Sequence, residues 1–528
     1  MSKRRVHFIG LIAVAILFVG TIFVRSNEFE RDMGGRHEWI TAHSLITMEI
    51  WREHGGPSAF GFNPVYSYPD CINFPRPAMG GVTDENGLHY YTSYPPFAFI
   101  FGYYATQIMG GPSVKTIRIL NYVIHLSCAI LLFLIFYELG FNKKRFNFAG
   151  LAIAGMYLYS TGFLYGHGLL FFCDMLEQIL VIGIIYLVVR FAKNRIKNLK
   201  LYYIGLFALF FLATYTEWLG LFFSFFAGLG FLLIFFIKKE KRFLMSFLII
   251  GIASSLALGT TIMQYSSIAG WDELKEISTQ KYNIRSGRVV NDPKLQLHIE
   301  NSETHNLLER GLAENYKTLQ NLIGAFGILF IPFVILRKFR NRMKGWRVPM
   351  GIILLLLLSV LTHYYVFFNF NALHAFSGMK TGLLISFVVA VLIMLIIQSM
   401  PDFKFRMIAG IVITGFLIFK LPGEFKRYEK YSNHTYMNLA SPARTIGEYQ
   451  DPNVAIFANA PFHPINLYYS KRDWFRAMDT STVSVFMTYF EVEEADYFIL
   501  DGDKVKERQR YQKYDDEFKL IDQEWINN

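Results

Sequence analysis

The sequence is poor in charged residues and in cysteine for a chain of its length. Lys, Arg, Asp and Glu make up only 18% of the 528 residues, whereas 53% are hydrophobic and 17% are aromatic. This composition excludes an ordinary soluble protein and indicates the membrane class. The three cysteines, Cys71, Cys128 and Cys173, lack metal-binding or redox spacing, so the sequence predicts neither a zinc site nor a disulfide framework.

Several sequence signals are also missing. No glycine-rich phosphate loop is present, so nucleotide binding is not indicated. No internal repeat is present, which argues against a transporter built from two comparable halves. No small-x-small cleavage site precedes Arg25, so the basic and apolar N-terminal segment is expected to be a retained signal anchor.

What the sequence does contain is a series of apolar runs, such as LLISFVVAVLIMLII, separated by short basic loops. Such runs belong to helices that cross about 30 Å of hydrocarbon. The net charge of +11 is concentrated in the loops, as the positive-inside rule predicts for cytoplasmic loops, and does not indicate nucleic acid binding. The predicted spans lie near 7–24, 114–137, 146–164, 169–191, 201–217, 219–237, 243–262, 321–337, 348–367, 380–399 and 406–421.

The predicted fold class is therefore an all-α polytopic membrane protein of about eleven transmembrane helices, with the N-terminus inside and the C-terminus outside. Residues 1–425 form the membrane domain, which includes a long first outer loop (25–113) and a flexible outer loop (263–320). The short run 97–109 is expected to be an interfacial or re-entrant helix, because it is too short to cross the bilayer comfortably.

Residues 426–528 differ in composition and predict a small extracytoplasmic α/β domain. Short strands are expected at 453–458, 474–478, 496–500 and 518–522. Helical patterns lie between them at 481–495 and 504–514. Alternating strands and helices favour a largely parallel sheet.

The stretch GGRHEWITAH, at the start of the first outer loop, predicts a juxtamembrane helix over Arg36–His54 that lies on the outer leaflet. Glu38 falls in its first turn, where unpaired N–H groups favour an ionised carboxylate. Such a carboxylate, in a site that excludes water, can act as a general base. The alternative is a glutamate that only stabilises the start of its own helix.

Polar residues within the spans gather toward the predicted outer side. Asp174 and Glu177 share one face of the fourth span, and His363 lies in the outer part of the ninth. Intramembrane charges are costly, so they usually face a cavity or one another. The alternative for each is a structural pair, such as Asp174 with Arg118. The remaining outer-side residues are Glu217, His374 and Lys380.

These features resemble the C-type glycosyltransferase superfamily over most of the chain. Its members are polytopic enzymes that move a sugar from a polyprenyl-phosphate carrier to an acceptor on the extracytoplasmic side, and they include protein O-mannosyltransferases and lipid A aminoarabinose transferases. The resemblance lies in the long first loop, the Pro95-Pro96 turn before the interfacial helix, Arg118 opening the second span, and Asp174 at the outer end of the fourth.

The resemblance implies roles for particular residues. The family's first-loop acidic pair falls on His37-Glu38, so that His37 replaces the first acid. The resemblance implies Glu38 as the catalytic base, with Asp32 and Asp174 as the alternative candidates. Relatives often carry Lys before the Pro-Pro pair, where this chain has Ser93-Tyr94; the phosphate-binding cation is then Lys380 with His374, or Arg118 or Arg36. The implied substrate-binding residues are His37, His43, Arg36, Tyr94, Arg118, Glu217, His374 and Lys380.

The predicted activity is inverting transfer of a sugar from a polyprenyl-phosphate donor to a lipid, glycan or protein acceptor, in a bacterial inner membrane with the active site facing outward. The alternatives are a transporter or flippase for lipid-linked sugars, a polymer ligase, and a non-catalytic scaffold. No cofactor is expected to be required. His37, Glu38 and His43 could hold zinc or manganese, but no spacing demands a metal.

Overall fold

The structure, a computed structural model, describes residues 3–73, 81–140, 147–286, 347–399, 403–432, 440–449, 451, 453–460, 463–501, 503–514 and 517–526. The chain divides into two compact units, each made of three segments. The first unit comprises Met1–Asn27, Arg118–Met263 and Ser278–Glu429, and the second comprises Glu28–Ile117, Gln264–Ile277 and Lys430–Asn528.

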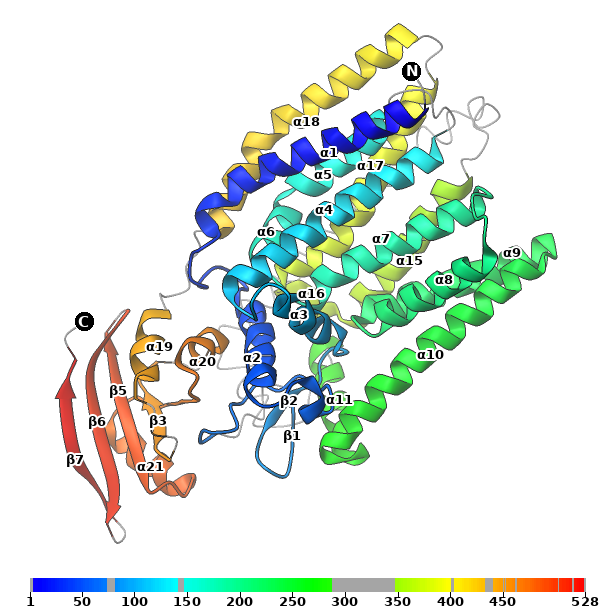
Figure 1. Cartoon of the computed structure of the whole chain (residues 1–528). Coiled ribbons are helices and arrows are strands. Elements are labelled where there is room, and N and C mark those ends of the chain that lie inside the picture. The colour runs from blue at the N-terminus through cyan, green and yellow to red at the C-terminus, as the bar shows by residue number, and fades with distance from the viewer. Residues whose placement is uncertain are drawn as a thin grey trace. The chain divides into compact units, whose positions relative to one another are not determined.

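The first unit is helical (Figure 1). Seven described helices are long and apolar enough to cross a membrane, or eight if one bent pair counts as a single span. This agrees with a polytopic membrane fold, while the predicted count of eleven stays a prediction and the predicted span 321–337 lies outside the described residues. Its helices are α1 (Lys3–Arg25), α4 (Val114–Leu139), α5 (Phe148–Tyr159), α6 (Thr161–Leu169), α7 (Cys173–Ala192), α8 (Leu199–Thr214), α9 (Trp218–Lys238), α10 (Lys241–Ala269), α15 (Arg347–Val366), α16 (Phe368–Leu373), α17 (Gly378–Ser399) and α18 (Phe403–Ser432).

The bent pair is α5 and α6, which meet at an angle of 58° where a single span over 146–164 was predicted. Ser160 breaks the helix, because its backbone is extended (φ −66°, ψ 135°). The freed groups of Thr161 are paired: its N–H donates to the Glu424 carboxylate at 2.8 Å and its hydroxyl donates to the same carboxylate at 2.6 Å. The carboxylate of α18 thus satisfies polar groups that a straight helix would have satisfied internally.

The segment after α10 was predicted to be a flexible loop from residue 263, and this prediction is wrong for its first part. The helix α10 continues to Ala269, and α11 (Trp271–Ser286) follows after Gly270. Gly270 has φ +90°, which lets the chain turn between the two helices. Asp272 and Glu273 lie in the first turn of α11, where carboxylates stabilise a helix N-terminus.

The second unit contains the helices of the first outer loop. They are α2 (Trp39–Glu53) and α3 (Phe97–Gln107), with the short 3-10 helices η1 (Ser26–Glu28) and η2 (Pro57–Phe60), and the hairpin β1 (Gly81–Thr83) and β2 (His89–Tyr91). The predicted helix at 97–109 is confirmed as a helix. The prediction that α2 lies on a surface is wrong, because every residue from Ile40 to Trp51 is buried.

The reason is that α2 packs against other elements of its own unit on several sides, including α3 and α20 (Pro464–Ser470). Side chains on the polar face of α2 form hydrogen bonds with neighbouring residues of this unit. The Thr47 hydroxyl donates to the Val65 carbonyl at 2.8 Å, and the Tyr68 hydroxyl donates to Glu49. The polar positions that suggested a wet face are therefore hydrogen-bonded interior positions.

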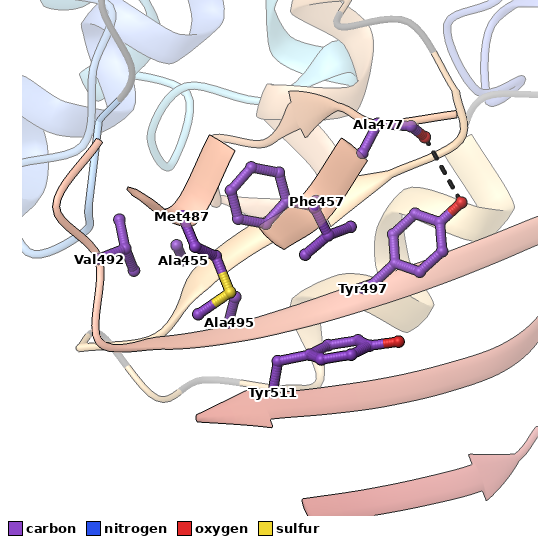
Figure 2. Close-up of a cluster of buried hydrophobic side chains, with 9 residues drawn as sticks. Ala455, Phe457, Ala477, Met487, Val492, Ala495, Tyr497 and Tyr511 are labelled. Atoms are coloured by element: carbon purple, nitrogen blue, oxygen red, sulfur yellow. Dashed lines mark hydrogen bonds between the residues drawn. The ribbon is translucent and has the colours of Figure 1, made fainter. Parts of the chain in front are cut away.

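The C-terminal part of this unit carries a five-stranded sheet with strand order β4-β3-β5-β6-β7. The strands β3 (Ala455–Ala458), β5 (Glu494–Asp501) and β7 (Glu517–Trp525) fall on predicted strands, as does the short β4 (Phe475–Arg476). The helices are α19 (Ala440–Gly447), α20 and α21 (Thr480–Tyr489). One face of the sheet buries Phe457, Met487 and Tyr497, and the Tyr497 hydroxyl donates to the Ala477 carbonyl (Figure 2).

Two predictions for this sheet are wrong. The segment 504–514 is not a helix but the strand β6 (Lys504–Tyr514), and the sheet is mixed: β3 pairs in parallel with β4 and β5, whereas β5, β6 and β7 are antiparallel. The residues of β6 are good helix formers, but pairing with the neighbouring strands determines that the segment is a strand. Arg510 lies opposite Asp496 in β5 and bonds its carboxylate at 2.9 Å.

Candidate functional site

Buried charge gathers at the ends of four helices of the first unit. Asp174 lies in the first turn of α7, Glu217 precedes α9 as its N-cap, His363 lies in the last turn of α15, and Lys380 lies in the first turn of α17. Each side chain is at most 1% exposed. We call these four residues, with Glu177, the charge cluster.

Lys380 is the cation of this cluster. Its Nζ lies 2.5 Å from Asp174 Oδ1 and 3.3 Å from Glu217 Oε1. It also lies 3.4 Å from the Ser377 hydroxyl. One lysine therefore holds carboxylates from two different helices, because ion pairing offsets the cost of burying charge in a low-dielectric interior.

A chain of hydrogen bonds continues from Glu217. Its Oε1 lies 3.1 Å from His363 Nε2. The Nδ1 of the same imidazole lies 3.2 Å from Asn371 Nδ2, and Asn371 Oδ1 accepts from the Ser377 hydroxyl at 2.5 Å. Because Ser377 also contacts Lys380, the network closes into a ring that fixes the position of each member.

Backbone geometry places Glu217 in this network. The connection between α8 and α9 is only three residues long, and Glu217 caps α9 by accepting the Leu219 N–H. Gly220 permits the tight corner, because a Cβ at this position would lie 2.2 Å from the Ala213 carbonyl oxygen. The glycine and the cap together direct the Glu217 carboxylate toward Lys380.

The charge cluster contains more carboxylate oxygens than hydrogen-bond donors that pair with them. Asp174 Oδ2 and both oxygens of Glu177 are buried and make no hydrogen bond within the part of the chain that the structure describes. Glu177 lies one turn after Asp174 on α7, as the i,i+3 spacing predicts. Buried polar atoms are normally paired, so these oxygens mark the point where this site can accept a proton or a donor group from a substrate.

Glu38 occupies a different environment in the second unit. Its carboxylate is fully buried, and its Oε2 accepts the backbone N–H groups of Gly34 at 2.7 Å and Gly35 at 2.5 Å. Arg31 donates to the same oxygen at 3.2 Å. Glu38 precedes α2 as its N-cap and makes no side-chain cap hydrogen bond, so it does not stabilise the helix in that way. Consecutive glycine amides form a concave anion-binding arrangement instead.

Asp32 and His37 flank this carboxylate in sequence and are held differently. Both Asp32 oxygens accept from Arg444, at 2.8 and 2.5 Å, and the carboxylate is 46% exposed. His37 has a left-handed backbone with φ +64°. Burial, together with the charge of Arg36, lowers the pKa of His37 from 6.5 to about 3, so the imidazole is neutral.

His43 and Tyr94 belong to an aromatic environment of the same unit. The His43 ring lies 5.4 Å from the Tyr66 ring and 5.5 Å from the Tyr91 ring, centroid to centroid. Tyr94 stacks on Tyr91 at 6.4 Å, and its carbonyl accepts the hydroxyl of Tyr265. These contacts place both residues in packed aromatic surroundings.

The remaining predicted cations and His374 have surroundings of their own. The Arg36 guanidinium lies over the Tyr431 ring at 5.3 Å within the second unit. Arg118 is 1% exposed in the first unit. The His374 ring stacks on Phe376 at 5.2 Å. Of the predicted site residues, the structure thus brings together Asp174, Glu217 and Lys380.

Sequence reasoning did not single out Asn371, Ser377, Gly34 or Gly35 as polar partners. For Asn371 and Ser377, the available signal was their position beside His374 in the short turn between two spans, where polar side chains are candidates to face a buried charge. For the glycines, the signal was the adjacent pair four and three residues before Glu38.

A metal site is not apparent in the described residues, where no group of three or more His, Cys, Asp or Glu side chains is arranged to hold a metal ion. The donor set that the sequence suggested, His37 with Glu38 and His43, is thus not arranged as a metal site.

No protein-family model and no curated protein matches the chain. Solved structures do. The oligosaccharyltransferase of Archaeoglobus fulgidus, tethered to an acceptor peptide, is 11% identical, covers 93% of this chain and 69% of its own, and gives a TM-score of 0.56. The oligosaccharyltransferase AglB from Archaeoglobus fulgidus, with an inhibitory peptide and a dolichol-phosphate, is 12% identical, with the same coverages and a TM-score of 0.51. ArnT from Cupriavidus metallidurans, bound to undecaprenyl phosphate, is 11% identical, with 92% of both chains covered and a TM-score of 0.49.

The likeness to the oligosaccharyltransferase, with the seven apolar helices, identifies the class: the chain is a multi-pass membrane protein that carries a sheet-containing C-terminal region. Its fold is similar to that of this oligosaccharyltransferase, which agrees with the resemblance found in the sequence.

Proposed function

We propose that this protein is an integral membrane glycosyltransferase that moves a sugar from a polyprenyl-phosphate donor to a hydroxyl-bearing acceptor on the extracytoplasmic face of a cell membrane. The observation that carries the proposal is the charge cluster: three carboxylates, a lysine and a histidine, buried among apolar helices. Charge buried at this density in a membrane bundle is costly and marks a functional site.

The fold supports the choice of reaction. The solved structures of the same fold are named as an oligosaccharyltransferase with a dolichol-phosphate and as one with an acceptor peptide. Because one fold can serve many reactions, the reaction is argued from the residues themselves. They supply buried carboxylates that can take a proton, and cations that can face a phosphate.

The proposed reaction is a single displacement. A carboxylate takes the proton of an acceptor hydroxyl, and the hydroxyl oxygen forms a bond to the anomeric carbon of the donor sugar. The bond from that carbon to the phosphate oxygen breaks, and the phosphate leaves with the electron pair. Attack opposite the leaving group inverts the anomeric configuration, through an oxocarbenium-like transition state.

Glu38 is the proposed base. Its buried carboxylate is oriented by Arg31 and the amides of Gly34 and Gly35, which is the preorganisation that proton transfer needs. Asp174 is the second candidate, supported by its Oδ2, which has no partner in the described chain. Asp32 ranks third, because Arg444 already engages both of its oxygens.

Lys380 is proposed to position Asp174 and Glu217 rather than to bind phosphate by itself. With the three carboxylates ionised, the cluster would carry more negative than positive charge and would repel a phosphate. Arg118 or Arg36 is then the proposed partner of the departing phosphate, where a preorganised cation lowers the barrier. His37, His43, Tyr94 and His374 are proposed to line the path of the substrates.

The transfer is proposed to proceed without a divalent metal. The residues His37, Glu38 and His43 do not form a ligand set in the described chain. Activity of the purified protein that survives EDTA would support this point. Activity that is lost with EDTA and restored by zinc or manganese would contradict it.

The experiment is sugar release from radiolabelled polyprenyl-phosphate sugars by the full-length protein in lipid nanodiscs, with crude membrane extract as acceptor source. The variants are Asp174→Asn and Lys380→Ala. The matched control is Glu30→Gln, whose exposed carboxylate pairs with Lys115. Transfer of one donor sugar by the wild type and by the control, lost in Asp174→Asn, is the expected result.

The rival flippase has a different outcome in the same nanodiscs and in vesicles. A folded wild type that releases no sugar from any donor, but that moves a labelled lipid-linked sugar across a vesicle bilayer, would replace the glycosyltransferase proposal with a transporter.

A further inference from the structure

A pocket of about 640 Å³ lies within the second unit. Its walls are η2, the turn of the β1–β2 hairpin, the end of α10 and the start of α11. The volume is in the range of sites that hold a single small ligand. Neither Glu38 nor any member of the charge cluster lines it.

The walls of this pocket are held together by packing. Val82 of the hairpin, Tyr265 of α10 and Leu274 of α11 form a small buried core. The Gln264 side chain donates to the Gly61 carbonyl at 3.4 Å and so joins α10 to the turn after η2. The pocket is therefore a feature of the folded unit rather than a gap between loose loops.

The hairpin turn is fixed by Asp84. Its Oδ1 accepts the backbone N–H groups of Asn86 and Leu88, both at 2.9 Å, and its Oδ2 accepts the Tyr90 hydroxyl at 3.0 Å. Asp84 thus acts as a structural residue, and it holds Tyr90 and the neighbouring Glu85 at the pocket wall.

Asn63 is the observation that points to a ligand. Its side chain is 97% buried, it lines the pocket, and its Oδ1 makes no hydrogen bond in the described chain. A buried amide oxygen without a donor costs stability, so its partner is expected to come from outside the protein. The group that completes it must be a hydrogen-bond donor, such as a hydroxyl or an amine.

The charge of the pocket agrees with this requirement. Glu85 and Glu273 add exposed carboxylates to the rim, and no basic side chain is among the described residues that line it. Neither glutamate forms an ion pair with the described residues, whereas Asp84 already accepts three hydrogen bonds. Two carboxylates at the mouth attract an amine and repel a phosphate or a uronic acid.

The apolar side of the pocket is the half-buried ring of Phe60. Sugars present a face of C–H groups and an edge of hydroxyl donors, so a lining that combines one aromatic ring with several acceptors matches a sugar ring. We propose that this pocket binds a hydroxyl-rich sugar that is uncharged or carries an amine, and that it excludes acidic sugars. That the sugar is a substrate rests on the proposed glycosyl transfer; the binding itself does not.

The test measures binding to the full-length protein in nanodiscs, without turnover. The probes are three tetrasaccharides: β-1,4-linked N-acetylglucosamine, β-1,4-linked glucosamine and α-1,4-linked galacturonic acid. The variants are Glu85→Gln combined with Glu273→Gln, and Asn63→Leu. The matched control is Asp272→Asn, which neighbours Glu273 in the first turn of α11 and does not line the pocket.

The expected result is binding of the first two tetrasaccharides and not of the galacturonate. The double glutamine variant should bind the glucosamine tetramer about tenfold more weakly, because it loses a charge-assisted hydrogen bond to the amine. Asn63→Leu should weaken binding of the uncharged and the amine-bearing tetramer alike. Asp272→Asn should match the wild type.

The transfer assay then separates the two sources of such a sugar. A raised KM for the acceptor in the pocket variants, with the KM for the lipid-linked donor unchanged, assigns the pocket to the acceptor glycan; the reverse assigns it to the donor sugar. Binding in a protein that shows no transfer would count against the proposed function and not against the pocket.

Two results would overturn the proposal. One is galacturonate binding as strong as that of the other tetrasaccharides. The other is the absence of binding by any of the three, or binding that both pocket variants leave unchanged while their thermal denaturation shows them to be folded.

Discussion

The two units of this protein bury carboxylates in opposite ways. In the second unit, Glu38 accepts two backbone amides and an arginine on one oxygen. In the first unit, Asp174 shares one lysine with Glu217, and Glu177 accepts no hydrogen bond from the described chain. Glu38 is held by donors from its own loop, whereas Asp174 and Glu217 share a lysine that is distant in sequence.

This difference shows where each unit is vulnerable. A carboxylate held by adjacent backbone amides keeps its place whatever happens to side chains elsewhere, because the amides belong to the same short loop. A cluster that depends on one lysine loses its electrostatic balance when that lysine is removed. The following changes would sharpen or break this contrast.

The largest effect is expected for Lys380→Met. It leaves Asp174 and Glu217 buried without their cation, and breaking a buried ion pair from one side typically costs about 3–5 kcal/mol of folding free energy. Thermal denaturation in nanodiscs should show a markedly lower Tm, and adding Asp174→Asn should recover part of the loss. Lys200→Met, at the exposed start of α8, is the control. Equal stability of Lys380→Met and wild type would mean that the cluster does not depend on this lysine.

Glu38→Gln should leave the fold intact and abolish most of the transfer. The glutamine carbonyl can still accept the glycine amides, but it cannot take a proton, and loss of a general base costs about 10²–10⁴-fold in rate. Sugar transfer and Tm should be measured on the same preparation. Activity close to that of the wild type would move the base role to Asp174.

Lowering the pH should weaken the second unit. Burial lowers the pKa of His463 from 6.5 to about 4 while its ring accepts the Ile465 N–H. Between pH 6.5 and 4 the unfolded chain binds a proton that the folded chain does not, so stability falls as the pH falls, by at most about 3 kcal/mol. The lowered pKa of His37 acts in the same direction.

The check is Tm against pH for His463→Asn, since asparagine can cap the helix but does not titrate. The variant should lose less stability than the wild type between pH 6.5 and 4. An unchanged slope would show that His463 is not responsible for it.

The smallest effect is expected for Glu177→Gln, and this change should raise stability rather than lower it. A buried amide costs less than a buried carboxylate that lacks a partner, so the variant should be more stable by about 1 kcal/mol. Its thermal denaturation should be compared with that of Glu240→Gln, at the exposed connection before α10. A loss of stability would show that Glu177 is held by a partner that its charge requires.

The sequence predicted the elements whose signal is local. Apolar runs located the seven described helices that are long and apolar enough to cross a membrane. The Pro95-Pro96 turn located the start of α3, because hydropathy and backbone restriction act within a few residues. The strands β3, β4, β5 and β7 contain apolar or aromatic residues, and they were found for the same reason.

Predictions failed where contacts between residues far apart in sequence determine the local structure. The strand β6 is rich in Lys, Arg and Gln, which favour a helix, and only its pairing with β5 and β7 on both sides makes it a strand. The polar residues of α2 predicted a wet face, but partners up to about four hundred residues away cover it: Lys471 lies 3.4 Å from Glu49 and 2.9 Å from Glu53.

The candidate site was predictable in part. Depth in the spans indicated Asp174, Glu217 and Lys380 as one group, because an isolated intramembrane charge is costly. It did not indicate that Lys380 lies between the two carboxylates, nor that Asn371 and Ser377 complete the ring. Lys380 lies 206 residues from Asp174, and His363 lies 146 residues from Glu217, so these two contacts follow from packing and not from spacing.

The bend between α5 and α6 has a practical consequence for anyone shortening the chain. The Thr161 backbone N–H has its partner in Glu424, close to the end of α18, more than two hundred residues later. A protein cut before residue 424 would expose that amide to lipid, where nothing can replace the lost acceptor. Removal of the C-terminal region should therefore begin after Ser432, at the end of α18, if the bent helix is to keep its shape.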